Sequence, residues 1–223
     1  TEASRYLAEE IANELGITNL GKVEKRIFGE VEHHYHIKVA NKIDLMGKDV
    51  IFVGSTHTDK DFLELIRVGS ALAGYGARRR IFIITFFGYS TMERAVHPGE
   101  VVTAKVNARM LSAIPNSGLG NTFLMLDLHS AGIVHYFEGD CLRSELYAEP
   151  VLVKSIASLK LKNFMFASAD MGRPLLVQSF ANTFGTDVAF IRKSRDFEKT
   201  KVLTVVGYVK DKRVIIYDDM CRS

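Results

Sequence analysis

The chain has 223 residues, of which 47% are hydrophobic and 25% are charged, and its formal net charge is +3. This length suits one large domain or two small ones, and the composition is that of a globular protein. The small net charge does not indicate a nucleic-acid partner, and no apolar stretch is long enough to cross a membrane. With no secretory signal and no metal-type spacing between Cys141 and Cys221, we expect free thiols and a cytoplasmic protein.

The spacing of apolar residues predicts strands that alternate with helices, which favours parallel sheets covered on both faces. The alternation occurs twice, over 1–147 and 148–223, so we expect an α/β protein with two doubly wound parallel-sheet domains. In chain order the predicted elements are a helix over 3–15, strands over 22–28, 34–39 and 49–53, a helix over 59–74, a strand over 80–87, a helix over 99–114, a strand over 122–127, a helix over 151–158, a strand over 163–168, a helix over 173–184, and strands over 187–192, 202–209 and 213–217.

Two adjacent carboxylates, Asp218 and Asp219, follow the last predicted strand. Ligands of open α/β sheets bind at the carboxyl ends of the strands, so a ligand is expected beside these acids. Paired acids suit the hydroxyls of a sugar or a hydrated Mg²⁺, and the small and basic residues after them suit a phosphate. The alternative is a solvated turn after an edge strand.

A further acid, Asp127, ends the predicted strand over 122–127, and His129 follows two residues later. Alternate residues of an extended segment point to the same side, so the carboxylate and the imidazole are expected to converge. Mg²⁺ takes carboxylate oxygen readily and imidazole less so. A core histidine bonded to the backbone is the alternative for His129.

Several segments occur together in the order and spacing of one known family, over nearly the whole chain. They are 88–94 (GYSTMER) with 98–105 (PGEVVTAK), 126–130 (LDLHS) through 136–137 (YF), and 214–220 (VIIYDDM). The chain resembles the ribose-phosphate diphosphokinases, also called phosphoribosyl pyrophosphate synthetases. The resemblance implies two domains of the type I phosphoribosyltransferase-like fold, the first on the ATP and Mg²⁺ side and the second, cut off within its sugar-phosphate loop, on the ribose 5-phosphate side.

The same resemblance implies an activity and an assembly. The family transfers the diphosphoryl group of ATP to the 1-hydroxyl of ribose 5-phosphate, gives 5-phosphoribosyl 1-diphosphate and AMP for nucleotide biosynthesis, and uses Mg²⁺ as its cofactor. Its members form homo-oligomers in which dimers assemble to hexamers. ATP and ribose 5-phosphate are therefore the expected partners.

By similarity, three groups of side chains carry the chemistry. Lys193 and Arg195 lie after the strand over 187–192, in the segment that matches a mobile loop of the family. Fixed cations there would stabilise the charge that phosphoryl transfer spreads over the non-bridging oxygens; an exposed basic loop is the alternative. The full implied set is Lys193, Arg195 and His129 as catalytic residues, Asp127, His129, Asp170 and Glu138 as metal ligands, Phe28, Glu30, Glu32, Arg94 and His129 for ATP, and Asp170, Asp218, Asp219, Cys221, Arg222 and Ser223 for ribose 5-phosphate.

The family's hairpin residues coincide here with a histidine-rich tract over 32–36. By similarity Phe28 stacks on the adenine of a neighbouring subunit and Glu30 accepts from its amino group. The tract itself could hold a metal, but alternation puts His34 and His36 on one face of the strand and His33 on the other. A single metal held by all three is therefore not expected.

The chain departs from the family where most members have Arg-Gln-Asp-Arg, because Thr91 and Met92 replace the first two residues while Arg94 remains. These departures favour a divergent branch of the family. Two other functions stay open, a non-catalytic partner subunit of such a synthetase and a phosphoribosyltransferase. Retention of the charged residues favours the enzyme, because clustered charges are costly to keep without use.

Overall fold

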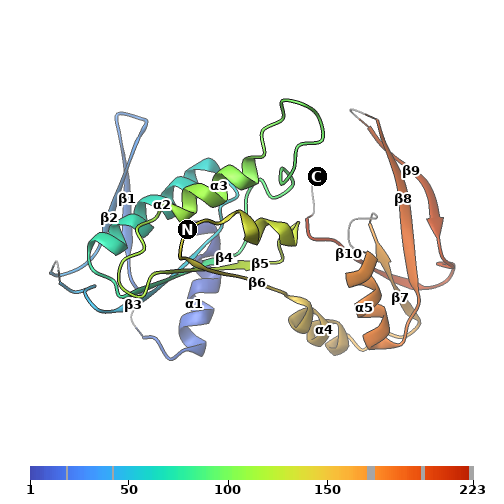
Figure 1. Cartoon of the computed structure of the whole chain (residues 1–223). Coiled ribbons are helices and arrows are strands. Elements are labelled where there is room, and N and C mark those ends of the chain that lie inside the picture. Colours follow the sequence, from blue (N-terminus) through green and yellow to red (C-terminus); the bar gives the residue numbers. More distant parts are fainter. Residues whose placement is uncertain (19, 42, 170–173, 197–198, 221–223) are drawn as a thin grey trace. The chain divides into compact units, whose positions relative to one another are not determined.

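The computed structural model describes residues 1–18, 20–41, 43–169, 174–196 and 199–220, with the backbone alone over 193–196 and 199–203. It divides into two compact units, Thr1–Leu146 and Tyr147–Ser223. Cys221, Arg222, Ser223 and Asp170 lie outside the described residues. Figure 1 shows the elements of each unit, and the expected α/β class is confirmed.

The first unit is built on the parallel sheet β3-β4-β5-β6, with a separate hairpin, β1-β2. Helices α2 and α3 lie on one face of the sheet, and α1 lies on the other, against β3 (Figure 1). The elements are η1 (Glu2–Ser4), α1 (Arg5–Glu14), β1 (Val23–Phe28), β2 (Glu32–Ile37), β3 (Asp49–Gly54), α2 (Asp59–Gly74), β4 (Arg79–Ile84), α3 (Thr103–Ser112), β5 (Asn121–Leu126), η2 (Ala131–Tyr136) and β6 (Leu142–Leu146).

The core of the first unit follows the period-2 alternation of its central strands. Phe82 and Ile84 of β4, together with Phe123 and Met125 of β5, are fully buried under α2 and α3. The rings of Phe82 and Phe123 stack with centroids 5.0 Å apart. Because β4 and β5 pair in parallel with Phe82 opposite Phe123, these aromatic side chains form one layer.

Two features of the first unit differ from the sequence prediction. Strand β6 was not predicted, because its residues (LRSEL) form a largely exposed edge strand without an apolar alternation. Helix α3 begins at Thr103 rather than at Gly99, because Glu100 closes a turn in which its Oε2 accepts hydrogen bonds from the amides of Val96 and His97. These two amides also hold the pKa of Glu100 below its usual value.

The hairpin β1-β2 is attached to α2 by one buried ion pair and an apolar patch. Lys25 Nζ lies 2.8 Å from Oε1 of Glu64, whose side chain is only 3% exposed. Tyr35 and Ile37 of β2 pack against the apolar face of α2. The opposite face of the hairpin, which carries Phe28, is left exposed.

At the amino edge of the first sheet, Arg80 is fully buried without an ion-pair partner among the described residues. Its guanidinium donates to Oδ1 of Asn121 at 2.7 Å and to the carbonyls of Ala77, Ser117 and Pro115 at 2.7, 2.8 and 3.1 Å. Burial lowers the pKa of Arg80. The side chain thus links β4, β5 and the loop that follows α3.

The second unit is built on the sheet β10-β7-β8-β9, in which β10, β7 and β8 are parallel and β9 is antiparallel to β8. Helices α4 and α5 cover one face, where Phe166 stacks on Phe180 with centroids 5.7 Å apart. The elements are α4 (Glu149–Ser158), β7 (Phe164–Ser168), α5 (Pro174–Phe184), β8 (Val188–Asp196), β9 (Lys199–Val206) and β10 (Arg213–Tyr217).

The antiparallel pairing of β8 and β9 corrects the prediction of a fully parallel second sheet. It also extends β8 to Asp196, so that the backbone of Lys193 and Arg195 lies within a strand and not in the loop expected after it. Strands joined by a short connection pair antiparallel, whereas a parallel neighbour needs a long crossover. No helix in the described part of either unit is long and apolar enough to cross a membrane.

We expect Arg80→Met to destabilise the first unit by about 3 kcal/mol, because four acceptors, two of them in buried hydrogen bonds, lose their donor at once. The free energy of unfolding in urea measures the effect. Arg79→Met is the matched control, because Arg79 is the exposed neighbour in the same strand, and we expect a change of about 0.5 kcal/mol or less. Equal effects of the two substitutions would contradict a structural role for Arg80.

Candidate active site

Asp127, Leu128 and His129 follow the carboxyl end of β5, and the chain turns there rather than running on as a strand. Asp127 has a φ of +42°, in the left-handed region that few residues other than glycine adopt. Leu128 is 2% exposed and belongs to the main core of the unit. The segment was expected to be extended, and this prediction is wrong at Asp127. The alternation of side chains in a strand therefore does not apply to Asp127 and His129.

Two hydrogen bonds donated to β6 hold this turn. The amide of Asp127 donates to the carbonyl of Leu146 at 2.9 Å, and the amide of Leu128 donates to Oε1 of Glu145 at 3.0 Å. The sequence prediction missed Glu145 because it missed β6. The sequence offered one signal for Glu145, which is that this carboxylate lies two residues before the end of the predicted first domain.

Glu138 does not join this group at the carboxyl edge of the sheet. Its Oε1 lies 2.6 Å from Nε of Arg109, and its amide donates to Oγ of Ser112 at 2.9 Å. Both partners lie in the last turns of α3, and the residues just after α3 contact Asn121 at the amino end of β5. The structure therefore places Glu138 toward the amino edge, away from the end of β5 that carries Asp127.

The loop between β4 and α3 carries Arg94 and begins with a close backbone crossing at Gly88. A Cβ on Gly88 would lie 1.9 Å from the carbonyl oxygen of Thr56, so no other residue fits. The hydroxyl of Tyr89 donates to Asp59 at 2.7 Å, and this carboxylate raises the pKa of Tyr89. Arg94 itself is exposed, with Nε 3.6 Å from the carboxylate of Glu93.

A tyrosine from η2 fixes the same loop at Glu93. The hydroxyl of Tyr136 donates to the backbone carbonyl of Glu93 at 2.6 Å, and Lys105 Nζ lies 6.0 Å from the centre of the Tyr136 ring. The segment after His129 is in this way joined to the residue beside Arg94. The sequence indicated only that Tyr136 belongs to a family segment and gave no sign of this bond.

The hairpin presents the residues expected at an adenine on its exposed side. Phe28 ends β1 opposite Glu32 and is 51% exposed, and its ring meets that of His34 edge-on at 5.4 Å. Glu30 lies in the turn with a φ of +67°. His36 and His34 share a face while His33 stacks on Tyr35 instead, as alternation predicts.

In the second unit, Asp218 and Asp219 stand directly after β10, at the carboxyl edge of the parallel strands. A carboxylate oxygen of Asp218 accepts a hydrogen bond from the amide of Asp219 at 2.9 Å. Ser168, at the carboxyl end of the neighbouring strand β7, is 2% exposed. For Lys193 and Arg195 the structure fixes the strand but describes no side chain.

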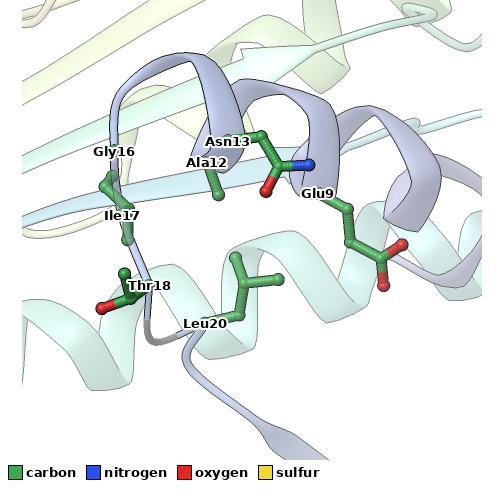
Figure 2. Close-up of a pocket in the computed structure, with 7 residues that line it drawn as sticks. All are labelled: Glu9, Ala12, Asn13, Gly16, Ile17, Thr18 and Leu20. Atoms are coloured by element: carbon green, nitrogen blue, oxygen red, sulfur yellow. The ribbon is translucent and has the colours of Figure 1, made fainter.

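A metal cluster or a surface hollow away from these edges would be an alternative site. No group of three His, Cys, Asp or Glu side chains is placed to hold a metal ion among the described residues. Figure 2 shows an open hollow at the end of α1, to which none of the expected site residues contributes. Its one charged side chain, Glu9, pairs with Arg5 at 2.9 Å. The hollow is lined by Glu9, Ala12, Asn13, Gly16, Ile17, Thr18 and Leu20.

Comparison with known proteins identifies the class. Residues 1–114 match the model of the N-terminal domain of ribose phosphate pyrophosphokinase. The chain is 35% identical over 218 residues to the ribose-phosphate pyrophosphokinase of Prochlorococcus marinus subsp. pastoris, covering 96% of this chain and 62% of the relative. It is 31% identical over 225 residues to that of Rhizobium meliloti, covering 99% of this chain and 69% of the relative. The protein belongs to the ribose-phosphate pyrophosphokinase family, which confirms the resemblance seen in the sequence.

The fold is also that of a solved structure. The phosphoribosylpyrophosphate synthetase from Mycobacterium smegmatis aligns with a TM-score of 0.79 at 23% identity, over 96% of this chain and 68% of that one. The chain thus spans about two thirds of the length of these relatives.

We expect Tyr136→Phe to loosen the loop over 88–102, because the carbonyl of Glu93 loses its donor. One such bond contributes about 1 kcal/mol, so local opening of the loop should become about fivefold more frequent. Amide hydrogen exchange of the loop measures this change. Tyr75→Phe, at the exposed end of α2, is the control and should leave exchange in the loop unaltered. The same protection in both variants would contradict the bond.

Proposed function

We propose that the protein is a ribose-phosphate diphosphokinase, which transfers the diphosphoryl group of ATP to the 1-hydroxyl of ribose 5-phosphate and releases AMP. The observation that carries the proposal is that each unit ends a parallel strand in the family's acidic motif. Asp127 and His129 follow β5, and Asp218 and Asp219 follow β10. Ligands of parallel α/β sheets bind at these carboxyl edges.

The reaction forms a bond between the 1-oxygen of the sugar and the β-phosphorus of ATP. The bond between that phosphorus and the oxygen of AMP breaks, and the hydroxyl proton is lost. Little covalent chemistry is required of the protein, so positioning and charge stabilisation dominate the catalysis. By similarity Lys193 and Arg195 supply the cations for the transferred group, and His129 is the third catalytic residue.

The donor set suits Mg²⁺. This ion binds through one or two carboxylates together with substrate phosphates and water, and not in a cage made only of protein groups. Asp127 offers such a carboxylate two residues before His129. Asp170 completes the set by similarity. When bound, Mg²⁺ neutralises charge on the phosphates of ATP.

Each substrate has its own unit. In the first unit Phe28 offers an exposed ring for the adenine, with Glu30 and Glu32 beside it and Arg94 for the phosphates. In the second, Asp218 and Asp219 accept from the 2- and 3-hydroxyls of the ribose. By similarity Asp170 also binds ribose 5-phosphate, and the 5-phosphate binds at 221–223, through the residues Cys221, Arg222 and Ser223.

The domain assignment follows from this division, and the assembly and location follow from the family resemblance. The segment 1–147 forms the ATP and Mg²⁺ domain and 148–223 the ribose 5-phosphate domain, in a cytoplasmic homo-oligomer of dimers that form hexamers. The exposed apolar residues Ile27, Phe28 and Val31 at the end of the hairpin support an assembly in which this end contacts a second subunit.

A non-catalytic partner subunit is the second candidate function, and Thr91 and Met92 favour it because they remove two polar contacts to ATP expected in the family. Tyr136 nevertheless holds the next residue, Glu93, in a defined position. A phosphoribosyltransferase is disfavoured because residues 1–114 match the N-terminal domain of the synthetases.

With Mg-ATP and ribose 5-phosphate, we expect the natural full-length protein to form AMP only when the sugar phosphate is present. Chromatography of the nucleotides measures this directly. Formation of ADP would mean single phosphoryl transfer and a wrong assignment of chemistry. A folded protein that turns over no nucleotide would favour the partner subunit.

We expect His129→Ala to raise the Mg-ATP concentration needed for half-maximal rate by about tenfold or more, because the variant loses a proposed ligand of Mg-ATP. The melting temperature should not change, because the side chain of His129 lies outside the core. His135→Ala is the control, since this exposed histidine lies in η2. An unaltered rate in His129→Ala would remove His129 from the site.

Lys193→Ala should lower kcat by about a thousandfold while KM for both substrates changes little, because its charge acts mostly in the transition state. Steady-state kinetics separates the two constants. Lys154→Ala, in an exposed position of α4, is the control. Weaker ribose 5-phosphate binding at an unchanged kcat would contradict the catalytic role of Lys193.

A further inference from the structure

Glu145 reaches from the edge strand β6 to the turn that carries Asp127 and His129. The other side chains of β6 are exposed, whereas that of Glu145 is half-buried. Its Oε1 accepts the amide of Leu128 at 3.0 Å. A hydrogen bond to an ionised carboxylate is about twice as strong as one between neutral groups. The one half-buried side chain of this strand therefore contacts the segment that carries the candidate site.

The bond acts on a backbone conformation that costs free energy. Asp127 has a φ of +42°, and a residue with a Cβ persists there only when its surroundings over-determine the geometry. The amide of Asp127 is held by the carbonyl of Leu146, and the next amide is held by Glu145. Strand β6 thus fixes the peptide groups on both sides of Asp127.

Because Leu128 is buried, the conformation of this turn determines the orientation of the Asp127 side chain. Its side chain is 2% exposed and contacts the core, so the chain cannot rotate about this residue without opening a cavity. With Leu128 anchored, the conformation of Asp127 decides where its carboxylate points. The hydrogen bond from Leu128 to Glu145 selects that conformation.

We propose that Glu145 is a positioning residue that directs Asp127, and through it His129, toward Mg-ATP. This proposal rests on the proposed function. Partners that orient metal ligands typically change metal affinity or activity by about 10-fold to 100-fold when they are removed. In this role Glu145 acts through its hydrogen bond with Leu128.

Two substitutions separate the hydrogen bond from the shape of the side chain. Glu145→Met keeps the length and removes both oxygens, and we expect the Mg²⁺ concentration for half-maximal AMP formation to rise by about tenfold. Glu145→Gln keeps a neutral acceptor, so the rise should be about threefold. Glu149→Gln is the matched control. It changes another half-buried carboxylate, which accepts from Ser179 at 2.6 Å, and should behave as the wild type.

A crystal structure of Glu145→Met supplies a readout that does not depend on activity, and Asp127 should leave the left-handed region. In an active enzyme, a wild-type Mg²⁺ requirement or an unchanged backbone at Asp127 would overturn the proposal. If the wild type forms no AMP, the proposed function fails. The backbone conformation of Asp127 in Glu145→Met then tests by itself whether Glu145 positions Asp127. If Glu145→Met does not fold, the Mg²⁺ requirement of Glu145→Gln decides, and a value equal to that of the wild type overturns the proposal.

Discussion

Leu128 lies in the hydrophobic core of the first unit, between two polar residues that must reach solvent. Its 2% exposure ties the segment after β5 to the same cluster as Ile133 and Phe137. The core holds the buried side chain of Leu128, and this leaves its neighbours, Asp127 and His129, at the edge of the sheet. The left-handed turn at Asp127 and its two bonds to β6 follow from this constraint. The position of the candidate site is thus set by packing and its orientation by hydrogen bonds.

The buried strands were predicted well from the sequence because buried strands are rich in apolar residues. Strands β4 and β5 are short apolar runs, and a fully buried strand needs such residues at nearly every position. The prediction failed at β6, whose charged and exposed residues owe their strand conformation to pairing with β5. The partners of the site were lost with it, since the bonds of Glu145 and Tyr136 join residues 17 and 43 positions apart. Such tertiary contacts leave no periodic signal.

The second sheet shows the same limit in its topology. Apolar periodicity indicated strands near 187–192 and 202–209 but carried no information on their direction. A short connection between them favours antiparallel pairing, and the paired segment extends far enough to include Lys193 and Arg195. The acids after β10 were placed correctly because an apolar run followed by two aspartates marks both the strand and its end. Lys193 and Arg195 lie within the β8-β9 hairpin, and charged residues in such a position do not mark where a strand ends.

The order of strands along the chain has a consequence for biosynthesis. The whole sheet of the first unit is encoded before residue 147, whereas β10 pairs with β7 only after β8 and β9 have been made. Domains fold as units in the order of their synthesis. A nascent chain can therefore carry a finished N-terminal unit while β7 still presents an unpaired edge, and such an edge is a template for association with other chains. During translation, β7 therefore stays open to such association until β10 has been made and has paired with it.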